Sequence, residues 1–283
     1  MYRYFLIFLF AVSLLFYSCK HEEYTIEAGE SQIVVEGWIE EGDVARVLVT
    51  RSIPMTDVID SVNFLKYAIR SATVIVSTEN ETDTLRLKSA TQYLPPFLYI
   101  GEKITGRTGE KYKLTVKYPD AVLTAESTIP PSVPLINVQY IHTNPGDTTG
   151  NLIVEFTDPA GRQDYYQIAT LLEGHDEIFV PCLYGNLSDK NFTSQDIRMQ
   201  ITRGITVFPK TNFESHFNDG DHIQVKLRTM TREGFDFWNL WQNEIVNAQN
   251  AIFPANRSLK GNIDGGIGIW CGYGHSSKNI IAR

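Results

Sequence analysis

Short stretches of alternating apolar and polar residues, separated by polar turns, occupy the first half of the chain after residue 31. Alternation with a period of two is typical of a strand with one buried face. In YKLTVKY, for example, Tyr112, Leu114 and Val116 share one face and polar residues share the other. Turn-forming clusters between consecutive stretches favour hairpins. The sequence therefore predicts strands at 32–39, 45–50, 72–77, 84–88, 112–118 and 122–129, the first four forming two hairpins.

The second half of the chain repeats this pattern. Asp158, Pro159 and Gly161 form one tight turn, and the acidic turn 218–221 precedes the alternating stretch HIQVKLRTM. The polar segment 185–195 predicts a surface loop. Evenly spaced short strands with little helix are typical of antiparallel β-sandwiches. The strands predicted here lie at 136–142, 152–156, 165–172, 197–202 and 222–230.

Three prolines interrupt the pattern at Pro130, Pro131 and Pro134. Proline cannot donate a ladder hydrogen bond and favours an extended linker. We therefore expect a mainly β protein of two antiparallel β-sandwich-like domains. The predicted divisions are a signal peptide at 1–18, a lipidated tether at 19–31, an N-terminal β-sandwich at 32–129, a proline-rich linker at 130–134 and a C-terminal β-rich domain at 135–283.

One segment departs from the β-pattern. Between residues 234 and 249, Phe235, Trp238, Trp241 and Ile245 recur at steps of three and four, which is the spacing of one helical face. The C-terminal domain is thus predicted to carry one amphipathic helix at about 234–249. Its two tryptophans could form a ligand platform, but packing against the core explains the spacing better.

The first 18 residues have the anatomy of an export signal. Arg3 precedes an apolar and aromatic run from Tyr4 to Tyr17, and Ser18 provides a small residue before the cut. As a helix, about 14 residues span about 21 Å, whereas a bilayer core needs about 30 Å. A cleaved signal explains this run better than a permanent membrane span.

Cys19 directly follows Ser18, so the pattern resembles a bacterial lipoprotein signal in which the thiol is lipidated. Two or three acyl chains would hold the protein on a membrane, because each buried methylene contributes about 0.8 kcal/mol. The alternative is an ordinary cysteine behind an ordinary signal peptide. Lys20, Glu22 and Glu23 resemble the surface-export signal of Bacteroidota lipoproteins, and a solvated linker is the alternative there.

Composition narrows the classes of function. With 43% hydrophobic and 20% charged residues, this is an ordinary folded chain. The formal net charge of −8 repels phosphate backbones, and no basic stripe is present, so we expect no nucleic-acid partner. The four N-x-S/T sequons are explained by chance if the chain is a bacterial lipoprotein.

Two cysteines and two tryptophans are further candidates. Cys182 and Cys271 would be the remaining thiols in an oxidising compartment, so they could form a disulfide or be two separate small apolar residues. Trp38 and Trp270 are possible ligand-stacking residues, since 12% of the chain is aromatic. We predict neither a catalytic nor a metal site and no cofactor: the six histidines are dispersed, the glycines near 266–272 miss the dinucleotide fingerprint, and no nucleophile elbow occurs.

The last glycine-rich run carries a family resemblance. Together with the aromatic helix before it and FTDPAG at 156–161, the segment GNIDGGIGIWCGYG at 261–274 resembles the Bacteroidota lipoprotein family catalogued as domain of unknown function 4249. The likeness extends over nearly the whole mature chain. It implies an outer-membrane lipoprotein of two β-rich domains, commonly encoded beside a TonB-dependent receptor. It implies no established catalytic residues.

Three hypotheses follow from these observations. The first is a non-enzymatic lipoprotein, anchored in the outer membrane at the cell surface or on the periplasmic face, that captures a ligand for a TonB-dependent uptake system or assists its receptor. The second is a glycan- or peptide-binding module that works alone. The third, a hydrolase, has only scattered acids behind it. The sequence does not name the ligand, whether small molecule, glycan or peptide.

Overall fold

The first of the two predicted hairpins forms, and so do the strands predicted at 112–118 and 122–129. In the computed structural model, which describes residues 31–53, 63–192, 194–204, 214–248 and 261–283, strand β1 (Ile33–Glu40) pairs antiparallel with β2 (Val44–Arg51). The turn places Gly42 at φ 79°, a conformation that glycine adopts without strain. Strand β7 (Lys111–Tyr118) pairs with β8 (Ala121–Thr128) in the same way.

The predicted strand at 84–88 is wrong as a single element. It divides at the buried Leu85: β4 (Thr82–Thr84) pairs with β3 (Thr73–Ser77), whereas β5 (Arg86–Ser89) pairs with β6 (Phe97–Thr105) in another sheet. Strand β6 was not predicted. The carboxylate of Asp83, only 2% exposed, accepts hydrogen bonds from the N–H groups of residues 102, 103 and 104. The alternation of apolar and polar residues does not reveal such a contact between distant segments.

The second half contains the five predicted strands and three more: β12, which the local pattern did not predict, the two-residue β14 and the long β16. The prediction of a loop at 185–195 is wrong for its first part. Residues 185–188 are the end of strand β12, where Asn186 and Leu187 pair with β11, and residues 189–191 form a 3-10 turn. The elements are β9 (Leu135–His142), β10 (Thr149–Thr157), β11 (Tyr165–Leu172), β12 (Val180–Ser188), η3 (Asp189–Asn191), β13 (Asp196–Ile201), β14 (Phe217–Asn218), β15 (His222–Met230), α2 (Arg232–Ala248) and β16 (Ile267–Ile281); in the first half, η2 (Asn63–Tyr67) is a 3-10 turn.

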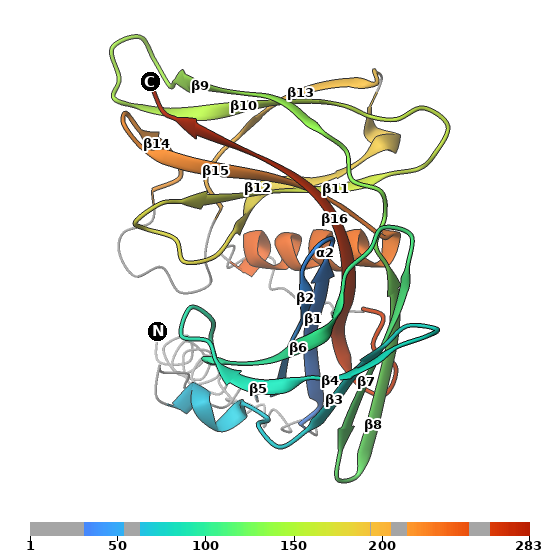
Figure 1. Ribbon diagram of the computed structural model, residues 1–283. Coiled ribbons are helices and arrows are strands. Elements are labelled where there is room, and N and C mark those ends of the chain that lie inside the picture. The colour runs from blue at the N-terminus through green and yellow to red at the C-terminus, as the bar shows by residue number, and fades with distance from the viewer. Residues whose placement is uncertain (1–30, 54–62, 193, 205–213, 249–260) are drawn as a thin grey trace, which may run out of the picture. The chain divides into compact units, whose positions relative to one another are not determined.

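Three sheets result from this order of elements. The largest has eight strands in the order β12-β11-β15-β16-β1-β2-β6-β5. One four-stranded sheet has the order β4-β3-β7-β8, and the other is formed by β13, β10, β14 and β9. Most pairs are antiparallel, but β1 and β16 are parallel. The long β16 runs from beside β1 to beside β15, so it joins both halves of the chain (Figure 1).

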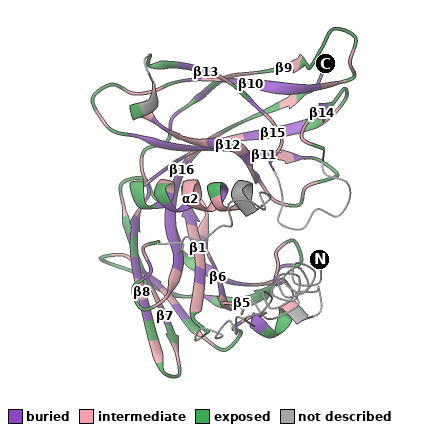
Figure 2. Ribbon diagram, turned by 180° about the vertical axis from the view of Figure 1, so that it is seen from behind, coloured by how far each residue is buried: buried purple, intermediate pink, exposed green. Residues whose placement is uncertain are grey.

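Two hydrophobic cores lie between these sheets. The first contains Val35, Val47, Val74, Val116 and Trp270, which come from the large sheet and from β3 and β7. The second contains residues of β10, β11 and β15, including Phe156, Tyr166 and Leu227. Buried residues follow the strands of both cores, whereas the turns are exposed (Figure 2). The mainly β, sandwich-like fold is confirmed, and the division into two domains stays a prediction.

The predicted helix is confirmed as α2, which begins two residues earlier and ends one residue earlier than expected. Its Phe235, Phe237 and Trp238 pack with a small third cluster that includes Tyr165 and Met230. Gly234 allows this close approach, because a Cβ there would lie 2.5 Å from Cys271 Sγ. Packing against the core therefore explains the start of the aromatic face. Among the residues that the structure describes, no helix is long and apolar enough to cross a membrane.

The glycine-rich segment before and within β16 lies tightly against the first core. Gly268 has φ 119°, and a Cβ there would lie 1.9 Å from the carbonyl oxygen of Val35 in the paired strand. A Cβ on Gly266 would lie 2.3 Å from a Leu123 methyl group. Close backbone packing, rather than phosphate binding, explains these glycines.

Candidate functional site

One face of the large sheet carries a group of buried charged and amide side chains. Along β15, Val225 and Leu227 enter the second core, so Lys226 and Arg228 lie on the opposite face, which is the side of α2. In β1, Glu40 alternates with the core residue Ile39, and β16 adds His275 opposite Arg228. Pleating alone thus brings charged residues from three strands to one place.

The ion cluster, defined here as Glu40, Lys226, Arg228 and His275, is mostly buried. Lys226 Nζ donates to Glu40 Oε2 at 2.7 Å, and Arg228 donates from Nε at 3.0 Å and approaches through Nη2 at 2.8 Å to Glu40 Oε1. The side chains of Glu40, Lys226 and Arg228 are 8%, 11% and 13% exposed. Both carboxylate oxygens of Glu40 are therefore satisfied by cations drawn from a distant part of the chain.

Electrostatics keep Glu40 ionised. Burial acts to raise its pKa, but the charges of Arg228 and Lys226 and the hydrogen bond from Lys226 outweigh burial and lower the pKa to about 2. Burial lowers the pKa of Lys226 and of His275, in both cases against the attraction of Glu40. With His275 neutral, two cations face one carboxylate.

Aromatic rings surround the ion cluster. The Lys226 ammonium lies 4.2 Å from the centroid of the Phe179 ring, and the Arg228 guanidinium lies 5.1 Å from that of Tyr273. Such cation–π contacts contribute more where water is excluded. The rings of Phe179 and Tyr273, together with Glu40, therefore stabilise the positive charges of Lys226 and Arg228.

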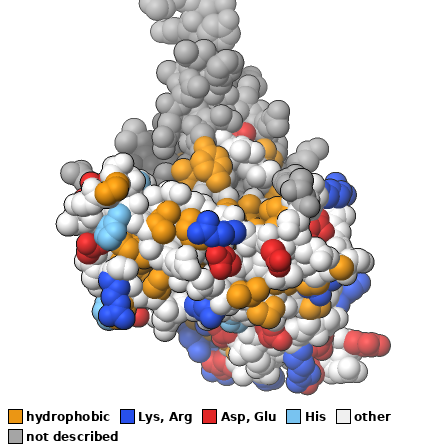
Figure 3. Space-filling model, turned by 90° about the horizontal axis from the view of Figure 1, so that it is seen from above, with side chains coloured by type: hydrophobic (Ala, Val, Ile, Leu, Met, Phe, Trp, Pro, Cys, Tyr) orange, Lys and Arg blue, Asp and Glu red, His pale blue; other side chains and the backbone are white. Residues whose placement is uncertain are grey.

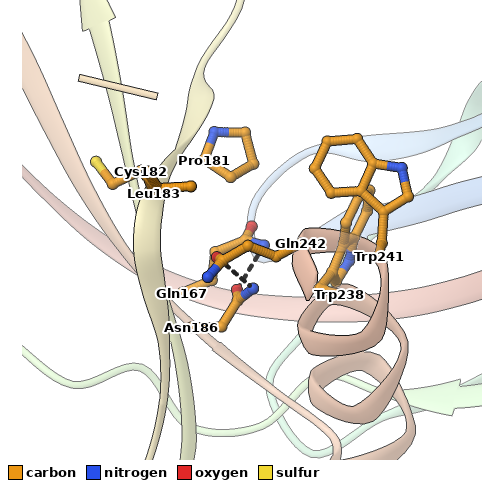
Figure 4. A pocket seen from close by; sticks show the side chains of 8 residues that line it. All are labelled: Gln167, Pro181, Cys182, Leu183, Asn186, Trp238, Trp241 and Gln242. Carbon is orange, nitrogen blue, oxygen red and sulfur yellow. Dashed lines mark hydrogen bonds between the residues drawn. The ribbon is translucent and has the colours of Figure 1, made fainter. Parts of the chain in front are cut away.

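A chain of amides leads from the ion cluster to α2. Arg228 Nη1 donates to Gln167 Oε1 at 3.1 Å, Gln167 Nε2 donates to Asn186 Oδ1 at 3.1 Å, and Asn186 Nδ2 approaches Gln242 Oε1 at 3.3 Å. Figure 4 shows the last two contacts as dashed lines. Gln242 Nε2 makes no hydrogen bond to another residue within the described part of the chain. The end of the amide chain can therefore donate to a water molecule or a ligand.

The amide chain ends in a small pocket between α2 and β12. Its lining includes Trp238 and Trp241 from the helix and Pro181 and Leu183 from the strand (Figure 4). The volume open to the centre of a water molecule is about 20 Å³. A single buried water needs about 10–15 Å³ on this measure, whereas a pocket for a drug-sized ligand spans about 300–1,000 Å³. The pocket can accept one polar group of a larger ligand, not a whole small molecule.

The structure separates the two tryptophans that the sequence nominated for stacking. Trp270 is 0% exposed, and its Nε1 donates to the carbonyl oxygen of Tyr112 at 3.0 Å, so it is a core residue and the prediction for it is wrong. Trp38 is half-buried and lies 5.7 Å from the ring of Tyr93. Its role in ligand stacking stays a prediction.

The two cysteines are free and fully buried. Cys182 belongs to the second core, and its sulfur points away from the pocket (Figure 4), whereas Cys271 lies under α2 in the third cluster. Burial raises the pKa of both thiols to about 12. Of the two alternatives left open by the sequence, the structure has separate apolar residues and not a disulfide.

The remaining nominated residues, Cys19, Lys20, Glu22 and Glu23, lie outside the described residues. Within residues 31–53, 63–192, 194–204, 214–248 and 261–283, no group of three His, Cys, Asp or Glu side chains could hold a metal ion. Sequence reasoning missed the ion cluster and the amide chain. Alternation in HIQVKLRTM placed Lys226 and Arg228 on one face, but nothing in that stretch indicated Glu40 as their partner.

A comparison with known families gives one match. The family model described as "Domain of unknown function (DUF4249)" matches residues 21–279, almost the whole chain. This agrees with the resemblance seen in the terminal motif, whose Asn262 side chain clamps the backbone of Trp270 from both its N–H and its carbonyl oxygen at 2.8 Å. No curated protein matches the chain.

Proposed function

The chain belongs to the family described as Domain of unknown function (DUF4249), and on that premise we propose that it is an outer-membrane lipoprotein of the Bacteroidota type. It is anchored through Cys19 and acts without catalysis, as a ligand-capturing or accessory partner of a TonB-dependent uptake system. The observation that carries the proposal is the apolar run from Tyr4 to Tyr17 followed by Ser18 and Cys19.

The anchor can be tested by fractionating cells. Cys19→Ala removes the thiol that would be lipidated, so the protein should move from the membrane fraction to the soluble fraction. Ser18→Ala keeps a small residue before the cysteine and should leave the protein at the membrane. Retention of the Cys19→Ala protein would contradict the anchor. Protease shaving of intact cells then tests whether Lys20 to Glu23 act as a surface address.

The partnership needs a separate experiment. Affinity isolation of the tagged wild-type protein from outer membranes should recover a TonB-dependent receptor at near-stoichiometric amount. The Cys19→Ala protein, prepared in parallel, is the control, because a partner met only at the membrane should be absent from it. Repeated recovery without such a receptor would refute the partnership while leaving the anchor intact.

The folded part supports a binding role in one respect. Hydrogen bonds through Gln167 and Asn186 hold the side chain of Gln242 at the pocket, so a polar group of a ligand would meet a preorganised donor there.

A stand-alone glycan- or peptide-binding module is the second candidate, and the pocket beneath α2 favours it. Trp238 and Trp241 lie beside the free donor of Gln242, which combines an apolar ring with a hydrogen-bonding amide. Glycan-array binding should be lost with Trp241→Ala. Leu87→Ala removes an exposed apolar side chain from β5, at the opposite end of the large sheet, and should leave binding unchanged. Equal binding by both variants would exclude the pocket as the site.

A further inference from the structure

The second half of β16 has an open edge. Residues 267–273 pair with β1 on one side, but β1 ends at Glu40. Beyond that point, β15 is the one strand that pairs with residues 274–281 among the described residues. In the large sheet β16 lies between β15 and β1, but its second half has no neighbouring strand on the β1 side among the described residues. A ninth strand could pair there, in line with β1.

Hydrogen bonds at both ends of this half fix the direction of its backbone groups. The carbonyl oxygen of Tyr273 accepts from the N–H of Glu41, on the β1 side. Ala282 instead exchanges hydrogen bonds with the turn before β15, because its N–H donates to Asp221 and its carbonyl oxygen accepts from Gly220. Successive residues of a strand point to opposite edges. The N–H and C=O groups of residues 277, 279 and 281 therefore point away from β15.

These groups have no partner in the described part of the chain. No hydrogen bond joins the backbone of Ser277, Asn279 or Ile281 to another described residue on that side. Their side chains are exposed. Near Ser276 the edge is covered, since the hydroxyl of Ser276 donates to Val133 and accepts from the N–H of Leu135. The accessible stretch begins at Ser277.

A groove follows this stretch. It lies between β16 and β9, is lined by Gln139, Tyr140, Asn279, Ile281 and Arg283, among others, and opens a volume of about 520 Å³ to water. On the face that carries β9, β10 and β13, hydrophobic side chains are interspersed with charged ones instead of forming one patch (Figure 3). The groove therefore differs from the rest of this face by its unpaired backbone N–H and C=O groups and not by a larger apolar area.

The opposite wall of the groove is also a strand edge. The N–H of Thr143 donates to Thr149, so residues of β9 with odd numbers point to β10 and those with even numbers point away from it. The backbone of Val138 and Tyr140 therefore faces the groove, and no hydrogen bond from it to another described residue is present on that side. An occupant of the groove meets unpaired donors and acceptors on both walls.

Three other edge strands, β12, β4 and β8, are protected. The pairing of β12 shifts register opposite β11 and includes Tyr184 at φ 58°, and β4 has three residues. The edge of β8 is covered, because Thr124 exchanges backbone hydrogen bonds with Asp264 and Asn262 donates to Glu126. Bulges, short strands and covering segments are the usual means of preventing added strands. The edge at 277–281 has a regular register with β15 and none of these protections.

We infer that this groove binds an extended segment of a partner protein, which adds to β16 at residues 277–281 as a strand. Donors and acceptors that repeat every second residue match the main chain of an extended polypeptide. Arg283 lines the groove and Lys278 directly precedes its lining residue Asn279. No ion pair joins either side chain to another described residue, so the segment should carry an acidic side chain. The inference is independent of the lipid anchor and of the TonB-dependent receptor.

The probe for this site is a phage-displayed library of random ten-residue peptides, selected on the wild-type protein and synthesised after selection. Selected peptides should be rich in Asp or Glu and should protect the amides of residues 277, 279 and 281 from hydrogen exchange. N-methylation of the peptide residues whose N–H groups face β16 should abolish binding. N-methylation of the alternate residues, whose N–H groups point away from β16, should weaken binding much less. Equal effects of the two sets of N-methylation, or protection elsewhere, would overturn the inference.

A matched pair of protein variants gives a second readout. Ser277→Pro removes one N–H from the open edge and should weaken the selected peptide at least about tenfold, since a lost pairing site and a steric block together exceed about 1.4 kcal/mol. Ser277→Ala keeps the N–H and should bind as the wild type. Selection of no peptide that distinguishes these variants would refute the site. A concentration-dependent dimer that Ser277→Pro abolishes would assign the edge to a second copy of the chain and not to a partner protein.

Discussion

The two halves of β16 differ although they belong to one strand. The first half carries the fully buried Trp270 on one face and Cys271 and Tyr273 under α2 on the other, and it has a paired strand on the β1 side. The second half has mostly exposed residues from Ser277 onwards, and within the described part of the chain it pairs only with β15. The ion cluster of Glu40 lies where one half passes into the other. The buried half, residues 267–273, lies between the first core and the third cluster and stabilises both. The open half, which ends in the exposed residues 277–281, is the part at which we propose that a partner binds.

Removing the centre of the buried half should have the largest effect. Trp270→Ala deletes a side chain that is 0% exposed and leaves the carbonyl oxygen of Tyr112 without its indole donor, so we expect a loss of about 3–5 kcal/mol in the free energy of unfolding. Urea denaturation followed by circular dichroism measures it. The half-buried Trp241 is the control, and Trp241→Ala should cost about 1 kcal/mol. Similar losses of unfolding free energy for both variants would mean that the burial of Trp270 does not stabilise the first core more than the half-buried Trp241 stabilises the fold.

Breaking the ion cluster should come next. Glu40→Gln leaves Lys226 and Arg228 facing each other without a carboxylate, and the pKa of about 2 corresponds to about 3 kcal/mol of stability at neutral pH. Glu126→Gln is the control, because its pair with Lys111 is exposed and should contribute less than about 0.5 kcal/mol. A loss below 1 kcal/mol for Glu40→Gln, measured by the same urea titration, would show that burial cancels the attraction.

Lowering the pH should gradually remove the stability that Glu40 contributes. The folded pKa of Glu40 is about 2 and its unfolded value is 4.5, so the unfolded state binds the proton first as the pH falls. The stability that Glu40 contributes is complete above about pH 4.5 and is lost between there and pH 2. The difference in unfolding free energy between the wild type and Glu40→Gln should therefore shrink across this window. A constant difference from pH 6 to pH 2 would assign the effect to packing instead of charge.

The smallest effect is expected at the open edge. Ser277→Pro removes an N–H that donates to no other described residue, so it should cost less than about 1 kcal/mol of stability. Lys278→Pro, one residue along, removes an N–H that points to β15 and should cost about 3 kcal/mol. Thermal unfolding of the two variants side by side measures the contrast. Equal destabilisation would show that the edge at Ser277 is already paired.

Local pattern was enough to predict much of the fold. The hairpin of β1 and β2, the pair β7 and β8, and the helix α2 each depend on residues within about twenty positions of one another. Periodicity of two or 3.6 reports such elements directly, because it records which side of a strand or helix is buried. The glycines of the terminal motif miss the dinucleotide fingerprint in the sequence, and the structure explains them by close packing.

Two strands escaped prediction because their signals are not local. Strand β6 combines apolar and charged residues, and the buried Asp83 ties it from another strand. Strand β12 ends with Asn186 and Ser188, and the side-chain amide of Asn186 is hydrogen-bonded to Gln167 and Gln242. A buried carboxylate or amide appears in sequence as an ordinary surface residue, so such segments resemble loops until their partners are placed.

The sequence by itself determined the fold class, the family resemblance and the faces of most strands, and its export signal with Cys19 stays a prediction. Only the tertiary structure decided that β16 joins both cores, that Trp270 is buried, that Cys182 and Cys271 remain apart, and that Glu40 meets Lys226 and Arg228. The physical reason is separation along the chain: Glu40 and Arg228 are 188 residues apart, and no periodicity extends over that range. Contacts of this kind exist only once the parallel pairing of β1 and β16 has formed.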